Sequence, residues 1–215
     1  MTYTKEQIAA ALDLAVLKPT ATARDVIRAA RLVQKEGLAA LCIAPCNVRL
    51  ARRYTDRVCA VIGFPHGNTL PTVKVLEAGL AIEHGAGELD VVINYGHLLA
   101  GKPKIVHEEL ILLVHLFKPM GIPIKAVLET CHYRPDQIRD ACKLCVNCGV
   151  DLVKTSTGFG PGGATPEAVK TMLEAVDGEA QVEASGGIET YADAARYLDL
   201  GCTRLGASTY RELLP

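Results

Sequence analysis

The chain has 215 residues, of which 49% are hydrophobic and 22% are charged, and its formal net charge is −1. A chain of this length and composition folds as a globular protein and buries enough surface to need no disulfide staples. The small net charge argues against nucleic-acid binding, and the sequence has no apolar run of about 18 residues that could span a membrane.

Apolar runs alternate with amphipathic stretches along the whole sequence. The runs predict eight strands, at 11–17, 38–44, 58–64, 88–94, 123–130, 151–157, 180–186 and 203–208. The stretches between them predict helices at 23–36, 47–54, 70–84, 104–119, 134–147, 165–175 and 190–199, with a short tail helix after Ser208.

Several helix boundaries carry their own signals. Thr165 followed by Pro166 is typical of an N-cap and a first helical residue. Thr190 and Asp193 have the spacing of a capping box. Glycines indicate three helix ends, at Gly37, Gly85 and Gly149.

Eight strand–helix units without a break in composition predict one (β/α)8 barrel, a TIM barrel, with 1–215 as a single domain. The alternative is a doubly wound dinucleotide-binding sheet, because Gly158, Gly160 and Gly163 satisfy GxGxxG and Glu183 follows. That motif belongs in the first βα turn, whereas here five units precede it and too few residues follow for a second half. The barrel is therefore the stronger interpretation.

Three of the eight cysteines, Cys142, Cys145 and Cys148, have the CxxCxxC spacing of part of an iron–sulfur site. The segment around them has helical spacing, and three-residue steps drift around a helix. Free cysteine is common in protein cores, so we expect three core thiols. The N-terminus lacks a secretion signal, so we expect the protein in the cytoplasm with its thiols reduced.

Isolated polar residues interrupt the predicted strands, at Asp13, Cys42, Asp90, Lys125, Glu129, Lys154 and Glu183. In a barrel, chemistry gathers at the carboxyl ends of the strands. Any one of these charges alone would suggest a structural ion pair. Several converging on one barrel face predict a catalytic site, because a buried charge is costly unless it is paired or used.

Lys154 is the candidate nucleophile. An unprotonated lysine amine attacks a carbonyl and gives an iminium, which accepts electrons while a neighbouring carbon–carbon bond breaks or forms. The ordinary lysine pKa is about 10.4, and burial or a nearby cation lowers it. A carboxylate such as Asp90 can shuttle protons during the condensation. This is aldolase chemistry without a metal, and the histidines lack metal-ligand spacing, so we expect neither metal nor cofactor.

Glycine-rich segments follow the sixth, seventh and eighth strands, at Gly158, at Gly186-Gly187 and around Ser208-Thr209. Backbone N–H groups in such loops hold phosphate, and barrels often keep a phosphate site after their last strands. The alternative is that these glycines only make tight turns. The two roles are compatible, so we predict a phosphate site there.

These motifs together resemble the deoxyribose-phosphate aldolase family. The resemblance rests on LDLAVLKPTAT, LCIAPCNV, VIGFPHGNT, ELDVVINYGHLLAG, IKAVLET, VKTSTGFGPGGAT, ASGGIET and RLGAST, which cover nearly the whole chain in order. It implies a (β/α)8 barrel and a class I, Schiff-base aldolase. The implied reaction interconverts 2-deoxy-D-ribose 5-phosphate with glyceraldehyde 3-phosphate and acetaldehyde, in deoxyribonucleotide catabolism and carbohydrate degradation.

The resemblance also implies roles for single residues. It makes Lys154 the Schiff-base lysine, Asp90 the essential aspartate and Asp13 a member of the proton relay. It implies phosphate or substrate contacts at Gly158, Gly186, Gly187, Ser208, Thr209 and Cys42, and it matches Lys125 and Thr130 to the IKxxxET motif. The implied partners are a phosphorylated sugar and an aldehyde, with no nucleic acid and no membrane, in a homo-oligomer of two or four chains.

Three positions depart from the family pattern. Glu183, in VEASGG, stands where the family usually has a second lysine. That lysine supplies the cation that lowers the nucleophile's pKa, whereas a carboxylate favours the ammonium form. Glu189 replaces a usual arginine beside the phosphate loop, and Ala15 replaces a common threonine.

Three interpretations of these departures stay open. In the first, the protein is a slower aldolase, with Lys125 as the remaining cation and Glu183 as an acid or base. In the second, substrate choice has shifted toward a less anionic compound. In the third, the barrel binds sugar phosphates and is catalytically impaired. Retention of Lys154, Asp90 and Asp13 argues against the third.

Overall fold

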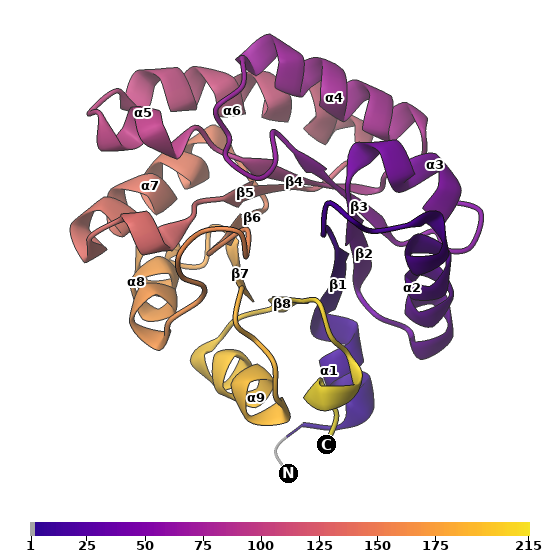
Figure 1. Ribbon diagram of the computed structural model, residues 1–215. Coiled ribbons are helices and arrows are strands. Elements are labelled where there is room, and N and C mark those ends of the chain that lie inside the picture. The colour runs from indigo at the N-terminus through magenta and orange to yellow at the C-terminus, as the bar shows by residue number, and fades with distance from the viewer. Residues whose placement is uncertain (1–2) are drawn as a thin grey trace.

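The fold is a closed barrel of eight parallel strands, seen end-on in Figure 1. The computed structural model describes residues 3–215. The strands pair in chain order and β1 closes on β8. They are β1 (Leu12–Val16), β2 (Ala40–Ile43), β3 (Val58–Ile62), β4 (Glu88–Val92), β5 (Ile124–Val127), β6 (Leu152–Lys154), β7 (Gln181–Ser185) and β8 (Arg204–Ala207). The predicted (β/α)8 barrel is confirmed, and the dinucleotide-binding sheet is wrong.

Helices surround the strands and cover their outer face (Figure 1). Six of them match predicted segments: α2 (Ala23–Glu36), α4 (Pro71–Glu83), α6 (Pro103–Phe117), α7 (Pro135–Cys148), α8 (Pro166–Val176) and α9 (Tyr191–Leu200). Within residues 3–215, no helix combines the length and the apolar character that a bilayer span requires.

The predicted capping signals act as expected. The Thr165 hydroxyl accepts the backbone N–H of Ala168, and Thr190 with Asp193 forms a reciprocal capping box. Gly37 and Gly149 end α2 and α7 in the left-handed conformation that glycine adopts without strain. At these boundaries, capping side chains and glycines therefore mark where the helix begins or ends.

Two predicted helices are corrected. The segment 47–54 holds only α3 (Val48–Ala51), after a 3-10 turn η1 (Pro45–Asn47), because Val48 and Ala51 are its buried residues and give a longer helix little to pack against. The tail is not an α-helix. It forms a 3-10 turn, η4 (Arg211–Leu213), in which only Leu213 is buried.

The sequence patterns missed two helices. α1 (Lys5–Ala11) runs without a loop into β1, so its apolar residues merge with those of the strand. Its capping box between Thr4 and Gln7 was the available signal. α5 (Tyr95–Leu99) is a short helix capped by Asn94. Two further 3-10 turns are η2 (Lys118–Met120) and η3 (Thr130–His132).

The cysteines of CxxCxxC lie in the core as the helical interpretation predicted. Cys142, Cys145 and Cys148 are buried on α7, which packs against α8. All eight cysteines are free thiols, and burial raises the pKa of Cys142 to about 12. These thiols act as small apolar side chains.

A buried ion pair fixes the loop that follows β3. Lys74 on α4 donates to the carbonyl of Val92 at 2.7 Å and pairs with Glu109 on α6 at 2.8 Å. Its stem passes so close to Gly63 that a Cβ there would lie 2.6 Å from Lys74 Cε. Gly63 has a positive φ of 65°, so it needs glycine on both counts. The pair thereby positions Phe64, which lines the central cavity.

Candidate active site

Five ionisable side chains meet inside the barrel. They come from β1, β4, β5, β6 and β7, and each is at most 6% exposed: Asp13, Asp90, Lys125, Lys154 and Glu183. A barrel interior is usually filled by branched apolar residues. This cluster therefore replaces part of an apolar core, and the five residues predicted to be catalytic do lie together.

Lys154 lies between two carboxylates. Its Nζ atom is 2.5 Å from Asp90 Oδ2 and 2.7 Å from Glu183 Oε1. Lys154 and Glu183 are register partners on β6 and β7, which places both side chains on the inner face. A Cβ on Gly206 would lie 3.0 Å from Glu183 Oε1, so glycine on β8 leaves room for the pair.

Lys125 lies deeper and joins the same carboxylates. It is fully buried, contacts Asp13 directly, and lies 3.0 Å from Asp90 Oδ1 and 3.1 Å from Glu183 Oε2. Asp90 and Glu183 therefore each bridge the two lysines, one oxygen to each. The charge of any one member acts on all the others.

Sequence reasoning missed two members of this network. Arg204, at the start of β8, lies 2.5 Å from Asp13 Oδ1 and 2.9 Å from Glu88 Oε2. Glu88 also lies 3.4 Å from Lys125. Both residues fell inside predicted strands, but their pairing across the barrel depends on strand register, which the sequence does not state. With them, four carboxylates face three cations.

The network keeps Lys154 protonated. Burial lowers the pKa of Lys154, but Asp90 and Glu183 outweigh burial and raise it well above its usual value. Burial would raise the pKa of Asp90, yet Lys125 and Lys154 hold it well below its usual range. Burial raises the pKa of Glu183 despite both lysines. The pKa of Asp13 is lowered as well, so of the buried carboxyl groups Asp13, Asp90 and Glu183, the last takes a proton most readily.

Lys125→Met is expected to lower the free energy of unfolding by about 3–5 kcal/mol at neutral pH, because three buried carboxylates lose their shared cation. Paired carboxylates with lowered pKa, such as Asp90, contribute stability above their unfolded pKa of about 4 and lose it as the pH falls. The difference from wild type should therefore shrink on acidification. Urea unfolding at neutral pH and at about pH 3, below the unfolded pKa of the carboxylates, measures it.

The matched control is Lys143→Met on the exposed side of α7, which should change the unfolding free energy by less than about 0.5 kcal/mol. Equal unfolding energies for Lys125→Met and wild type would contradict the network described above.

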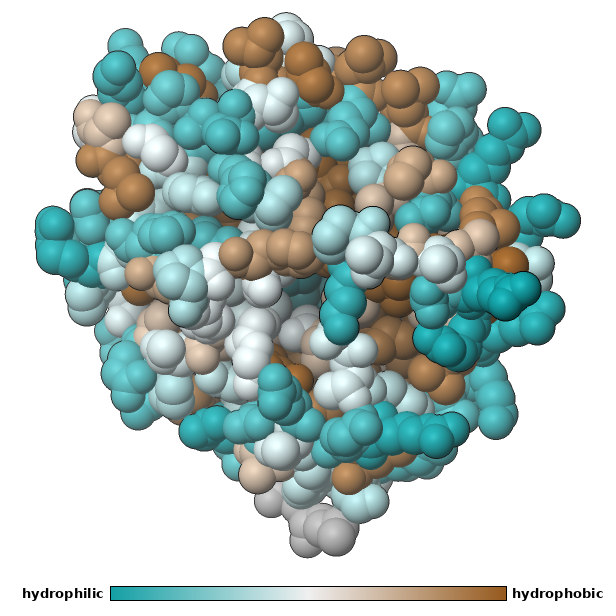
Figure 2. Space-filling view, in the orientation of Figure 1, coloured by the Kyte–Doolittle hydropathy of each residue, from teal (hydrophilic) through white to brown (hydrophobic). Residues whose placement is uncertain are grey.

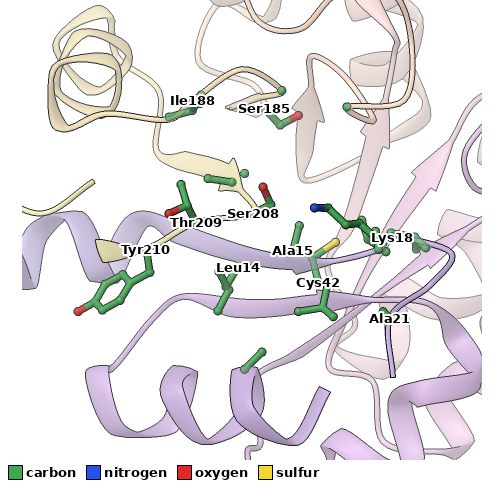
Figure 3. A pocket seen from close by; sticks show the side chains of 18 of the residues that line it. Leu14, Ala15, Lys18, Ala21, Cys42, Ser185, Ile188, Ser208, Thr209 and Tyr210 are labelled. Atoms are coloured by element: carbon green, nitrogen blue, oxygen red, sulfur yellow. The ribbon is translucent and has the colours of Figure 1, made fainter. Parts of the chain in front are cut away.

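A cavity of about 1210 Å³ opens above the cluster at the carboxyl ends of the strands. Figure 3 shows side chains from several loops turned toward it. Eight of the predicted site residues line it: Cys42, Asp90, Lys154, Gly158, Gly186, Gly187, Ser208 and Thr209. Asp13, Lys125 and Glu183 do not line the cavity and lie beneath its floor. Only Asp90 and Lys154 of the charged cluster can touch a bound molecule.

The loops after β7 and β8 present unpaired backbone donors to this cavity. Within residues 3–215, the N–H groups of Gly186, Gly187, Ser208 and Thr209 have no protein acceptor. Gly186 and Gly187 have φ values of 86° and 76°, where side chains are strained. Successive N–H groups in such loops form an anion-binding concavity.

The last glycine of GxGxxG, Gly163, allows two loops to pack closely. A Cβ on Gly163 would lie 2.3 Å from the carbonyl oxygen of Gly186, so the loops after β6 and β7 can touch only with glycine there. The hydroxyl of Thr209 donates to Glu212, whereas the backbone N–H of Thr209 has no protein acceptor within residues 3–215.

Two further cavity residues were missed by sequence reasoning. The Ser156 hydroxyl is fully buried, lines the cavity and has no hydrogen-bond partner within residues 3–215. Lys18 reaches from the loop after β1 into the cavity opposite Ser208 (Figure 3). The KTST and LKPTAT motifs contained both residues. Their positions just after the carboxyl ends of β6 and β1 could have identified Ser156 and Lys18 as site residues.

Two thiols lie beside Asp90, and of the two only Cys42 lines the cavity. Cys59 Sγ is 3.1 Å from Asp90 Oδ1 and Cys42 Sγ is 3.5 Å from Oδ2. These three side chains, or Asp13, Asp90 and Glu183, come close enough together to ligate one ion. Lys125 and Lys154 already occupy the space among the carboxylates and repel a cation there, so the donors do not suit a metal.

Nearly the whole chain is similar to known proteins. Residues 7–209 match the model of the DeoC/LacD family aldolase. A deoxyribose-phosphate aldolase of Thermoanaerobacter sp. strain X514 is 44% identical over 207 residues, covering 94% of this chain and 92% of the relative. One of Treponema denticola is 38% identical over 202 residues, covering 92% and 94%.

Two solved structures have the same fold and related sequences. An aldolase named QR15 superposes with a TM-score of 0.92 at 33% identity, covering 96% of this chain and 93% of that one. The deoxyribose phosphate aldolase of Aeropyrum pernix, described as a unique tetramer, gives 0.87 at 31% identity, covering 98% and 90%. Given the barrel, the lysine held within it and these similarities, the chain belongs to the DeoC/LacD family of aldolases.

Proposed function

We propose that this chain, with 1–215 as one aldolase domain, interconverts 2-deoxy-D-ribose 5-phosphate with D-glyceraldehyde 3-phosphate and acetaldehyde through a Schiff base on Lys154. The observation that carries the proposal is the position of Lys154 Nζ. It is the one lysine of the buried cluster that lines the cavity, with a carboxylate at 2.5 Å. The names of the relatives supply the substrate.

In the cleavage direction, Lys154 Nζ first gives up a proton and attacks the aldehyde carbon. The carbinolamine loses water to form an iminium. The hydroxyl on C3 then loses its proton, the bond between C2 and C3 breaks, glyceraldehyde 3-phosphate leaves, and the electron pair of the broken bond forms an enamine. The enamine takes a proton on carbon, and water hydrolyses the new iminium to acetaldehyde and the free amine. Each of these steps transfers a proton.

Asp90 is suited to carry those protons because it lines the cavity and touches Nζ. Its pKa is held low by two ammonium groups. When Lys154 loses its proton one of those charges disappears, so the pKa of Asp90 rises and the carboxylate becomes a better proton acceptor. Asp13, Lys125 and Glu183 lie beneath the floor of the cavity, and their charges affect this transfer of protons between Lys154 and Asp90.

The unpaired N–H groups of Gly186, Gly187, Ser208 and Thr209 would hold the phosphate, and the free Ser156 hydroxyl would meet a substrate hydroxyl. Glu189 and Glu212 line the cavity and oppose a phosphate. Lys18 and Arg211 also line it, and within residues 3–215 neither has a carboxylate partner. These two cations offset the acids, which supports a phosphorylated substrate over a less anionic one.

Lys18→Met should raise KM for deoxyribose 5-phosphate about tenfold and leave kcat nearly unchanged, because Lys18 contributes charge and not chemistry. For unphosphorylated deoxyribose KM should not change. Initial rates with both sugars, at low and high salt, measure the effect, which salt should weaken. An equal change for both sugars would contradict a phosphate contact by Lys18.

A direct assay of the purified protein tests the function itself. We expect cleavage of deoxyribose 5-phosphate to acetaldehyde and glyceraldehyde 3-phosphate without added metal or cofactor. The absence of turnover in a folded protein would favour the impaired sugar-phosphate binder instead.

We also propose that the reaction takes place in the cytoplasm, because eight free thiols suit a reducing compartment.

A further inference from the structure

Glu129 is a buried carboxylate that the proposed reaction does not use. It follows β5, is 1% exposed and does not line the cavity. Within residues 3–215 its carboxylate pairs with no cation, and it accepts hydrogen bonds from the hydroxyl and N–H of Thr157 and from the Cys131 thiol. The other buried carboxylates each have a lysine beside them. Burying a charge without a cation is costly, which points to a use for Glu129.

The backbone of Glu129 is strained as well. Its φ and ψ are both 60°, in the left-handed region that residues other than glycine rarely adopt. On either side of it, the Leu128 N–H donates to the Lys154 carbonyl and the Thr130 N–H donates to the Thr155 carbonyl, both at 2.9 Å. These bonds fix the strained residue beside the end of β6. Strain of this kind clusters at functional sites.

The partner of Glu129 is the loop between β6 and α8, residues 155–165, which we call the β6 loop. Figure 1 draws it in orange at the end of the barrel, and Figure 2 shows pale residues of intermediate hydropathy over the same part of the surface. Residues 157–159 of the loop line the cavity. A Cβ on Gly160 would lie 3.0 Å from Glu129 Cδ, so the loop packs directly against the carboxylate.

β7 holds the two ends of the β6 loop. The Thr155 hydroxyl donates to the Ser185 carbonyl and accepts the Ser185 N–H, both at 2.9 Å. The Ala164 N–H donates to the same carbonyl at 3.1 Å. Between these attachments, and within the described part of the chain, the hydrogen bonds that residues 157–163 make outside the loop all go to Glu129.

The contact with Glu129 also sets which donor of the loop stays free. The Thr157 hydroxyl donates to Glu129 and accepts the Phe159 N–H at 3.0 Å, while the Thr157 N–H lies 3.4 Å from the same carboxylate. Gly158 lies between these two N–H groups, and within residues 3–215 its own N–H has no protein acceptor. The contact therefore leaves the Gly158 N–H for a ligand in the cavity.

We propose that Glu129 is a positioning residue, which holds the β6 loop through Thr157 in the conformation that binds substrate. The proposal rests on the proposed aldolase function and adds to it a residue that does not line the cavity. A loop that is ordered before binding improves affinity, because the entropy of ordering it is not lost on binding. A displacement of about 1 Å at a site can cost about a hundredfold in rate.

Steady-state cleavage of deoxyribose 5-phosphate measures the effect on catalysis. Glu129→Ala should lower kcat/KM about a hundredfold, mostly through KM, because the loop binds substrate while Lys154 keeps its own carboxylates. Acetaldehyde with borohydride should still label Lys154 as in wild type, since that reaction needs no phosphate contact. Glu129→Gln keeps a carbonyl acceptor for Thr157 and should recover about tenfold of the loss.

Hydrogen exchange followed by mass spectrometry reports on the loop without any turnover. The peptide that contains Thr157 should exchange about tenfold or more faster in Glu129→Ala than in wild type. The double variant Glu129→Ala/Thr157→Val should lose no more activity than the worse single variant, because both changes remove one contact. Glu174→Ala, at an exposed position of α8, is the matched control and should equal wild type in every measurement.

Wild-type exchange in Glu129→Ala would overturn the proposal. So would faster exchange with unchanged kcat/KM, or a loss of borohydride labelling as large as the loss of cleavage. If circular dichroism shows that Glu129→Ala is unfolded, Glu129→Gln and Thr157→Val provide the same comparison. A wild type that is neither labelled nor active would reject the aldolase function instead, and exchange alone would then decide whether Glu129 holds the loop.

Discussion

Lys154→Arg and Lys154→Met should each lower aldolase activity by about ten-thousandfold or more, because neither side chain can form an iminium. Arginine keeps a positive charge between Asp90 and Glu183, so the loss in Lys154→Arg cannot be assigned to a broken ion pair. Steady-state rates of deoxyribose 5-phosphate cleavage, with circular dichroism as the check on folding, measure the effect.

Covalent trapping identifies the attacking atom directly. Acetaldehyde with borohydride should add one reduced ethyl group to the tryptic peptide that contains Lys154, and none to either variant. Lys125 is the rival nucleophile by position, but it is fully buried and does not line the cavity. Lys170→Met, on the exposed side of α8, should be labelled as wild type is. A label on Lys125 or Lys18, or turnover by Lys154→Arg, would remove Lys154 from its role.

The fold could be predicted because each strand is a short apolar run bounded by turn residues. All eight strands lie within the predicted ranges, and Thr165 and Thr190 begin helices as their types suggest. The errors occurred where local pattern carries little information. α1 joins β1 without a loop, and the tail after β8 is too short to bury a helical face.

The sequence was enough to predict which residues form the candidate site, but not which of them face the cavity and which lie beneath it. Polar residues inside apolar strands identified Lys154, Asp90 and Glu183, because burial of a charge needs a reason. Which of them face the cavity and which lie beneath it depends on strand register and barrel stagger. Arg204 and Glu88 were missed for the same reason, since their partners come from strands distant in sequence.

Glu183→Lys should raise the cleavage rate at neutral pH about tenfold or more. The substitution removes a carboxylate 2.7 Å from Lys154 Nζ and puts an ammonium group near it. Both changes lower the raised pKa of Lys154, and each unit of decrease gives about tenfold more free amine at neutral pH. The acidic limb of the pH–rate profile should move to lower pH. Rates from acidic to alkaline pH measure both effects.

Glu183→Gln separates charge from proton transfer. It removes the negative charge without adding a positive one, so an electrostatic role predicts a rate between those of wild type and Glu183→Lys. Glu183 does not line the cavity, which favours this role over direct proton transfer to the substrate. A loss of activity in Glu183→Gln would instead make Glu183 the carrier of the Lys154 proton. An unchanged rate and pH profile in both variants would show that Glu183 does not control the charge of Lys154.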